Sequence, residues 1–187
     1  MYAMGAETTF GPARWARLAV ALVNTAPGER HGDTLSGPGD LRAMLLAHQE
    51  PEPVTIDDRD LADAREARAE LAAVFAAEDP AELAARLNNL LARTARPRLA
   101  AHDGVPLHLH LDPPGSSWGQ WLAASGAMAL ALLIAEHGTA ILGHCAAPGC
   151  HHAVIRLGRG PTRRYCDSRC AARWRVAAHR ARRARST

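Results

Sequence analysis

The 187-residue sequence contains no lysine, so its 22 strongly basic residues are all arginines. A guanidinium stays charged at physiological pH and binds carboxylates or phosphates through two parallel hydrogen bonds. The N-terminus lacks a basic start followed by an apolar core and a small-residue cleavage site, which argues against a secretory signal. We therefore expect a cytoplasmic protein in a reducing environment.

Long apolar segments and catalytic motifs are also scarce. The dense apolar stretch at residues 121–135 is shorter than the ~20 residues that a membrane-spanning helix needs, so we expect a buried helix there. The polar residues before the cysteines form no nucleophile–base pair, phosphate loop or paired carboxylates at an informative spacing. The sequence predicts no catalytic residues and a protein that is not an enzyme; an enzymatic pocket in the front part is the alternative.

Helix-forming patterns fill most of the chain. Alanine is abundant and favours helix, and 48% of the residues are hydrophobic, enough for a packed core. Apolar residues recur at helical spacing between proline and glycine breaks, which predicts helices over residues 12–23, 40–47, 57–77, 80–95 and 116–137. The last is apolar nearly all round, as in a central helix. Residues 96–111 favour a β-hairpin, because Asp103-Gly104 is a hairpin-turn dipeptide and leucines alternate with histidines over residues 107–111.

All four cysteines of the chain lie within its last third. Their spacing, C-x4-C, fifteen residues, then C-x3-C, is similar to the two-pair patterns that complete a tetrahedral zinc site. Four thiolates close the coordination shell, so we predict one structural Zn²⁺ per chain. The predicted ligands are Cys145, Cys150, Cys166 and Cys170.

Two other uses of these cysteines are weighed against zinc. The four could form two disulfides, but a reducing compartment disfavours them. A neighbouring imidazole could replace one sulfur, the neighbours being His144, His151 and His152. A complete cysteine set makes that substitution unnecessary, and such histidines are usually solvated or support a ligand.

The residues around the cysteines predict a small domain. Pro148-Gly149 forms a tight turn typical of a zinc knuckle. Residues 153–157 favour a strand, 158–161 a turn and 162–165 a return strand, and a helix follows over residues 166–185 with the last two cysteines in its first turn. The expected fold is mainly α (α+β): a helical domain with one hairpin over residues 1–138, and a treble-clef-like zinc finger (knuckle, hairpin, helix) over residues 139–187.

The charges divide between these two parts. Residues 145–187 contain eleven arginines and one acid, a balance of +10, whereas residues 1–144 contain eleven arginines and eighteen acids, a balance of −7. A dense positive field of this kind binds polyanions. On a helical projection, one stripe spanning about 80° contains Arg169, Arg173, Arg180 and Arg183.

DNA is the partner that this stripe favours most. Arg163 and Arg164, just before Cys166, join the stripe as predicted nucleic-acid contacts. The alternatives are a solvated helix end, which contacts nothing, and a zinc-stabilised module that meets an acidic protein surface.

Several segments together resemble a known family. They are LAVALVNT at residues 18–25, Asp33-Thr-Leu, Asp40-Leu-Arg, LADAREARAEL at 61–71, LNNLL at 87–91 and RRYC at 163–166. The chain is similar to bacterial proteins that join an N-terminal ABATE domain to a C-terminal CGNR zinc finger and are described as stress-induced transcription regulators. The resemblance implies a zinc-binding DNA-binding regulator with the same four cysteine ligands.

The sequence departs from the family pattern in its finger. The tetrapeptide that gives the finger its name is here Cys170-Ala171-Ala172-Arg173, and the usual acid of the first strand falls on Arg156. The last cysteine pair is also one residue closer. Contacts that other members make through the missing Asn or Asp are therefore not expected here.

The front domain offers one residue for ligand binding. Asn24 stands in the Val-Asn-Thr of the resemblance, and binding of a small-molecule effector is one of two roles considered for it. The favoured reading is a helix C-cap, because Pro27 and Gly28 end the helix there. A small-molecule effector of the helical domain and a second copy of the chain, in a homodimer, are the other partners considered. We expect no membrane partner.

Overall fold

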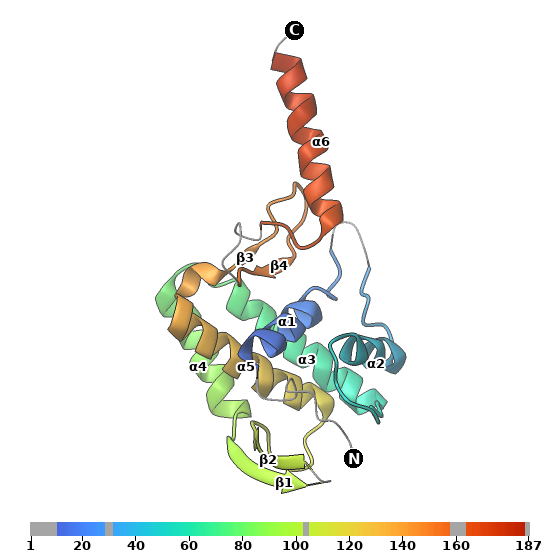
Figure 1. The fold of residues 1–187 in the computed structure, drawn as a ribbon, viewed down its shortest axis with the longest axis vertical. Coiled ribbons are helices and arrows are strands. Elements are labelled where there is room, and N and C mark those ends of the chain that lie inside the picture. Colours follow the sequence, from blue (N-terminus) through green and yellow to red (C-terminus); the bar gives the residue numbers. More distant parts are fainter. Residues whose placement is uncertain (1–10, 29–31, 103–104, 158–163, 186–187) are drawn as a thin grey trace.

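The computed structural model describes residues 11–28, 32–102, 105–157 and 164–185 (Figure 1). The helical part comprises α1 (Pro12–Val23), α2 (Pro38–Ala47), α3 (Asp58–Phe75), α4 (Pro80–Thr94) and α5 (Trp118–His137), with strands β1 (Arg98–His102) and β2 (Val105–His110) between α4 and α5. The C-terminal part comprises the 3-10 turn η1 (Thr139–Ile141), β3 (Leu142–His144), β4 (Ala153–Ile155) and α6 (Ser168–Arg185). The mainly helical fold with a small β component is confirmed.

Local chemistry explains where these helices begin. Asp57 caps α3 by accepting a hydrogen bond from the Asp60 amide at 2.8 Å, and the Asp60 carboxylate accepts one from the Asp57 amide. The same reciprocal arrangement at Ser117 opens α5. Pro38 is the first residue of α2, so this helix starts two residues before the predicted bound. Apolar periodicity located the helices, and capping chemistry set their ends.

Helix α5 is the centre of the helical part, with α1, α3 and α4 packed around it (Figure 1). By length and mean hydropathy it also passes the test for a membrane span, yet 56% of that stretch is buried inside the protein. Its fully buried leucines, Leu122 and Leu130, meet Leu18 and Leu22 of α1 in the main core. This burial is that of a core helix, as the sequence predicted.

Gly119 lets α5 approach α3 closely. A Cβ at this position would overlap the backbone of Asp63 and Ala64 in α3. Two hydrogen bonds hold the start of α5 against α3. The Trp118 amide donates to the Asp60 carboxylate at 2.8 Å, and the Ser117 hydroxyl donates to the Asp63 carboxylate at 2.5 Å. Backbone on both sides leaves little room for adjustment.

We expect Gly119→Ala to lower the free energy of unfolding by about 3 kcal/mol, at the upper end of overpacking costs. Urea unfolding measures it. The matched control is Gly39→Ala in α2, where no atom lies within 4 Å of the added methyl group. The control should be neutral or slightly stabilising, because alanine favours helix. Equal stability of the two variants would contradict the close approach.

One strand pairing in the C-terminal part was not predicted from the sequence. β4 pairs antiparallel with β3, in the register Leu142↔Ile155 and His144↔Ala153, whereas the expected partner was a return strand at residues 162–165. Arg164 and Tyr165 are in no strand, and the expected turn and the rest of that strand lie outside the described residues. β4 is buried at all three positions, and it pairs with the chain that leaves α5.

β4 separates two cores. Ala153 and Ile155 belong to the main core of the helical part, whereas Val154 belongs to a small cluster with the cysteines. Alternate side chains of a strand point to opposite faces, so three residues contact both cores. The predicted domain boundary falls at Gly138, the C-cap of α5 with φ +78°, and the strands that follow pack back onto the helices.

Helix α6 starts later than expected. It begins at Ser168, so Cys166 precedes the helix and the prediction that both last cysteines lie in its first turn is wrong for Cys166. Asp167 explains the delay, because its side chain accepts a hydrogen bond from the Cys170 amide at 2.6 Å. That bond lowers the pKa of the Asp167 carboxyl. The helix then projects away from the rest of the protein (Figure 1).

Candidate metal centre and basic helix

The first two cysteines sit on a knuckle that joins β3 to β4. The Cys145 amide donates to the His152 carbonyl at 2.8 Å, and the Cys150 amide donates to Ala147 at 3.0 Å. Gly149 adopts φ +62°, a conformation that other residues rarely adopt. The predicted Pro148-Gly149 turn therefore brings Cys145 and Cys150 to one side of the hairpin.

The second pair reaches the same point from the start of α6. The Ala146 amide donates to the Arg164 carbonyl at 2.8 Å, which ties the knuckle to the segment before the helix. The Cys166 amide donates to the Cys145 sulfur at 3.4 Å. Such N–H···S bonds stabilise the thiolate form of a ligand.

The four sulfurs form a compact cluster in which all ligand atoms lie within 4.8 Å of one another. Cys166 Sγ is 3.3 Å from Cys170 Sγ and 3.8 Å from Cys150 Sγ, and Cys170 Sγ is 3.7 Å from Cys150 Sγ. Sulfurs around a tetrahedral Zn²⁺ are separated by about 3.8 Å, given a Zn–S bond of about 2.3 Å. All four cysteines are free thiols, so the disulfide alternative does not describe this arrangement.

The thiols of the cluster differ in their electrostatic environments. Burial opposes ionisation of Cys145, yet hydrogen bonds from the Ala147 and Cys166 amides lower its pKa. Burial raises the pKa of Cys166, and it raises that of Cys170 to about 11. A bound divalent cation removes this conflict, because it stabilises all four thiolates together. Four soft sulfur donors, close enough together to surround one ion tetrahedrally, fit Zn²⁺ well.

Arg173 interacts with the metal cluster. Its Nη2 donates to Cys170 Sγ at 2.6 Å, although the residue as a whole is exposed. Four thiolates around a divalent ion carry a net charge of −2, so a guanidinium beside one sulfur stabilises the site. The helical projection, which considers only the direction of each side chain, could not reveal this contact.

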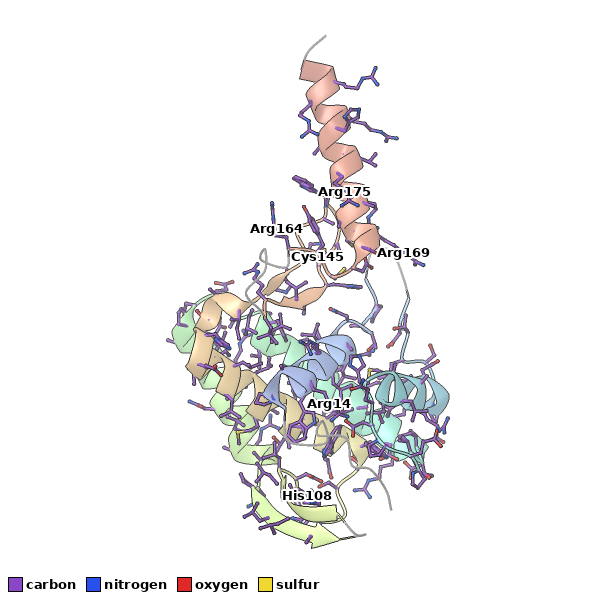
Figure 2. All side chains as sticks on the ribbon, viewed as in Figure 1. Arg14, His108, Cys145, Arg164, Arg169 and Arg175 are labelled. Carbon is purple, nitrogen blue, oxygen red and sulfur yellow. The ribbon has the colours of Figure 1, made fainter. Side chains whose placement is uncertain are left out.

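The other predicted arginines that the structure describes lie at the same end of the protein as the cluster (Figure 1). Arg169 and Arg180 are exposed on α6, as is Arg183, whereas Arg163 lies outside the described residues. Arg164 is also exposed, and its guanidinium lies 5.5 Å from the Trp174 ring centroid. Figure 2 shows Arg164, Arg169 and Arg175 near Cys145, with His108 at the opposite end of the protein.

Two exposed arginines on α6 were not predicted from the sequence as part of the basic surface. Arg175 and Arg182 are seven residues apart, so they share a face that lies away from the predicted stripe. The spacing of seven residues indicates this shared face from the sequence alone, but the predicted stripe includes only the arc of the helix with the most arginines. The helix therefore presents positive charge on more than one face.

Asn24 joins the helical part to the C-terminal part. It is the C-cap of α1, as favoured from the sequence, and its side chain pairs with the backbone of β4. The Asn24 Nδ2 donates to the Ala153 carbonyl at 3.0 Å, and the Ala153 amide donates to Asn24 Oδ1 at 2.7 Å. Both polar groups of the side chain are thus used within the protein, and a role in effector binding stays a prediction.

Two further sequence features have defined positions. Arg156, which replaces the expected acid, donates to the Ala140 carbonyl at 3.0 Å and to the Leu142 carbonyl at 3.3 Å, across β3. His144 and His151 are exposed. Within the described ranges, the metal-ligating cluster contains the four cysteines alone.

Two family models match the chain. The ABATE model, described as a putative stress-induced transcription regulator, matches residues 16–137. The CGNR zinc finger model matches residues 142–183 and so includes all four cysteines. A search of the curated proteins gave no match.

Proposed function

The chain belongs to the ABATE family of transcription regulators and carries a CGNR zinc finger, and from this premise we propose that it binds DNA through helix α6. In the proposed mechanism one structural Zn²⁺ held by the four cysteines fixes the knuckle to the start of α6. The proposed setting is the bacterial cytoplasm, under stress, and the proposed role requires no catalytic centre.

The observation that carries the proposal is the charge and shape of α6. The helix has seven arginines and no acidic residue in its 18 residues. At 1.5 Å per residue it is about 27 Å long and, with side chains, about 10–12 Å wide. A major groove about 12 Å wide accepts a helix of this diameter. Arginines on more than one face could contact phosphates on both sides of such a groove.

The exposure of α6 also supports a polyanionic partner. Val176 is 50% exposed, and Arg175, Ala177, His179 and Arg180 are exposed as well. A short helix without packing is marginally stable in water, and neighbouring arginines repel one another. Phosphates neutralise that repulsion, so DNA would stabilise the part of the helix that the protein does not cover.

Fluorescence anisotropy with a labelled duplex of about 20 base pairs at rising salt tests the proposal. Three to five phosphate contacts should give a slope of log K against log salt of about −2.7 to −4.5. The zinc-loaded full chain is the sample, and the same duplex with an excess of unlabelled duplex is the control for competition. No binding to any genomic fragment at about 50 mM salt would rule out DNA as the partner.

A further inference from the structure

A cavity of about 250 Å³ lies at the seam between the helical part and the finger. Its walls come from α1, from His48 at the end of α2, and from β4, with the metal-cluster residue Cys166 at one side. A concave site between two parts of a protein, with a few polar groups among apolar walls, is typical of small-ligand pockets. The apolar walls include Val20, Ala21 and Ile155.

Arg17 supplies the charge of this cavity. It is exposed on α1, and among the described residues its guanidinium makes no hydrogen bond or ion pair. Arg14, one turn earlier, is engaged: it donates to the His48 carbonyl at 3.1 Å and pairs with Glu50 at 2.5 Å. Because Arg14 and Glu50 neutralise each other, Arg17 leaves the seam with one uncompensated positive charge.

His48 is the second polar group of the cavity. The residue is half-buried, and its imidazole makes no hydrogen bond within the described ranges. Burial lowers the pKa of His48, and the charges of Arg14 and Arg17 lower it further. At neutral pH the ring is therefore uncharged, with one nitrogen that can donate a hydrogen bond and one that can accept one.

We propose that this seam cavity binds a small organic monocarboxylate, with its carboxylate on Arg17 and its apolar body against Val20, Ala21 and Ile155. One uncompensated guanidinium matches one negative charge, and the planar fork of arginine matches a carboxylate. Since the cavity includes residues of α1 and of β4 beside Cys166, the ligand contacts both the helical part and the finger. This binding does not depend on the proposed DNA contact.

The probe is sodium butyrate, titrated into the ¹⁵N-labelled, zinc-loaded full chain without DNA. We expect saturable shifts of the Val20, Ala21 and Ile155 amide signals with a dissociation constant of about 1–10 mM, a weak affinity suited to a small fragment. Butyramide, which has the same shape and no charge, should bind at least about tenfold more weakly. Sodium chloride at equal ionic strength separates specific binding from screening.

The variant Arg17→Gln should weaken butyrate binding about tenfold or more, because it removes the charge and leaves a shorter polar side chain. The matched control is Arg59→Gln, whose side chain is 72% exposed on α3, outside the cavity, and which should bind as wild type does. The proposal is overturned by the absence of saturable shifts, by equal binding of butyramide, or by an Arg17→Gln variant that binds normally. These outcomes leave the DNA test unaffected, since no DNA is present.

Discussion

Replacing Cys170 by serine should reduce the bound zinc from one ion per chain to none. Cys170 is buried beside two other sulfurs, and a serine hydroxyl is a poor replacement for a thiolate ligand. Structural zinc sites of this type are worth about 10–16 kcal/mol of binding free energy in isolated finger peptides. The metal content, measured by mass spectrometry after exhaustive dialysis, gives the result directly.

The same variant should lose order in a limited region. The knuckle and the start of α6 depend on the cluster, whereas Ala153 and Ile155 are held by the core of the helices. Amide exchange should therefore accelerate in residues 145–150 and 164–175 and stay slow in α5. DNA affinity should fall to the level of an unordered basic tail. His151→Ser, which changes an exposed neighbour outside the cluster, should keep its zinc; a Cys170→Ser protein that also keeps it would refute the four-sulfur site.

Replacing Arg169, Arg180 and Arg183 together by glutamine should lower the affinity for DNA by about 10²–10³-fold at 0.1 M salt. Each neutralised phosphate contributes about 0.9 to the salt slope, which is roughly tenfold in affinity at that salt concentration. The slope itself should become less steep by about 2.7. Arg173 is left intact, because its contact with Cys170 would mix an effect on the metal with an effect on DNA.

A variant with the same change in net charge is the control. Arg42, Arg59 and Arg93 lie on the helical part and make surface ion pairs, so their combined change to glutamine alters the total charge without altering α6. This control should keep most of the DNA affinity. Similar losses in the two triple variants would mean that net charge, rather than α6, attracts the nucleic acid.

The parts of the fold that the sequence predicts well are those set by local pattern. Apolar spacing located the helices, and the four cysteines came together as their spacing implied. The pairing of β4 with β3 was not predicted, because it depends on a distant surface: Ile155 is buried in the core of the helices. No short-range pattern identifies residues 142–144 as a partner of β4.

The side-chain contacts between the helical part and the finger could not be predicted from the sequence either. Asn24 and Ala153 are 129 residues apart, and a capping position explains the asparagine without any such partner. The contact of Arg173 was not predicted for a different reason: a long flexible side chain on an exposed face can bend back to bind a sulfur three residues away. Charge and periodicity give the direction of a side chain, while the packed structure gives its partner.

The attachment of β4 gives α6 the mechanics of a lever arm. The hairpin is held by Asn24 on one side and by the sulfur cluster on the other, so these elements would tilt as a unit. A rotation of about 10° at β4 would displace the far end of the helix by about 5 Å, given its length of about 27 Å. That displacement exceeds the spacing of about 3.4 Å between neighbouring base pairs. With α6 in a DNA groove as proposed, a slight adjustment at the seam would therefore move the far end of the helix by more than one base-pair step.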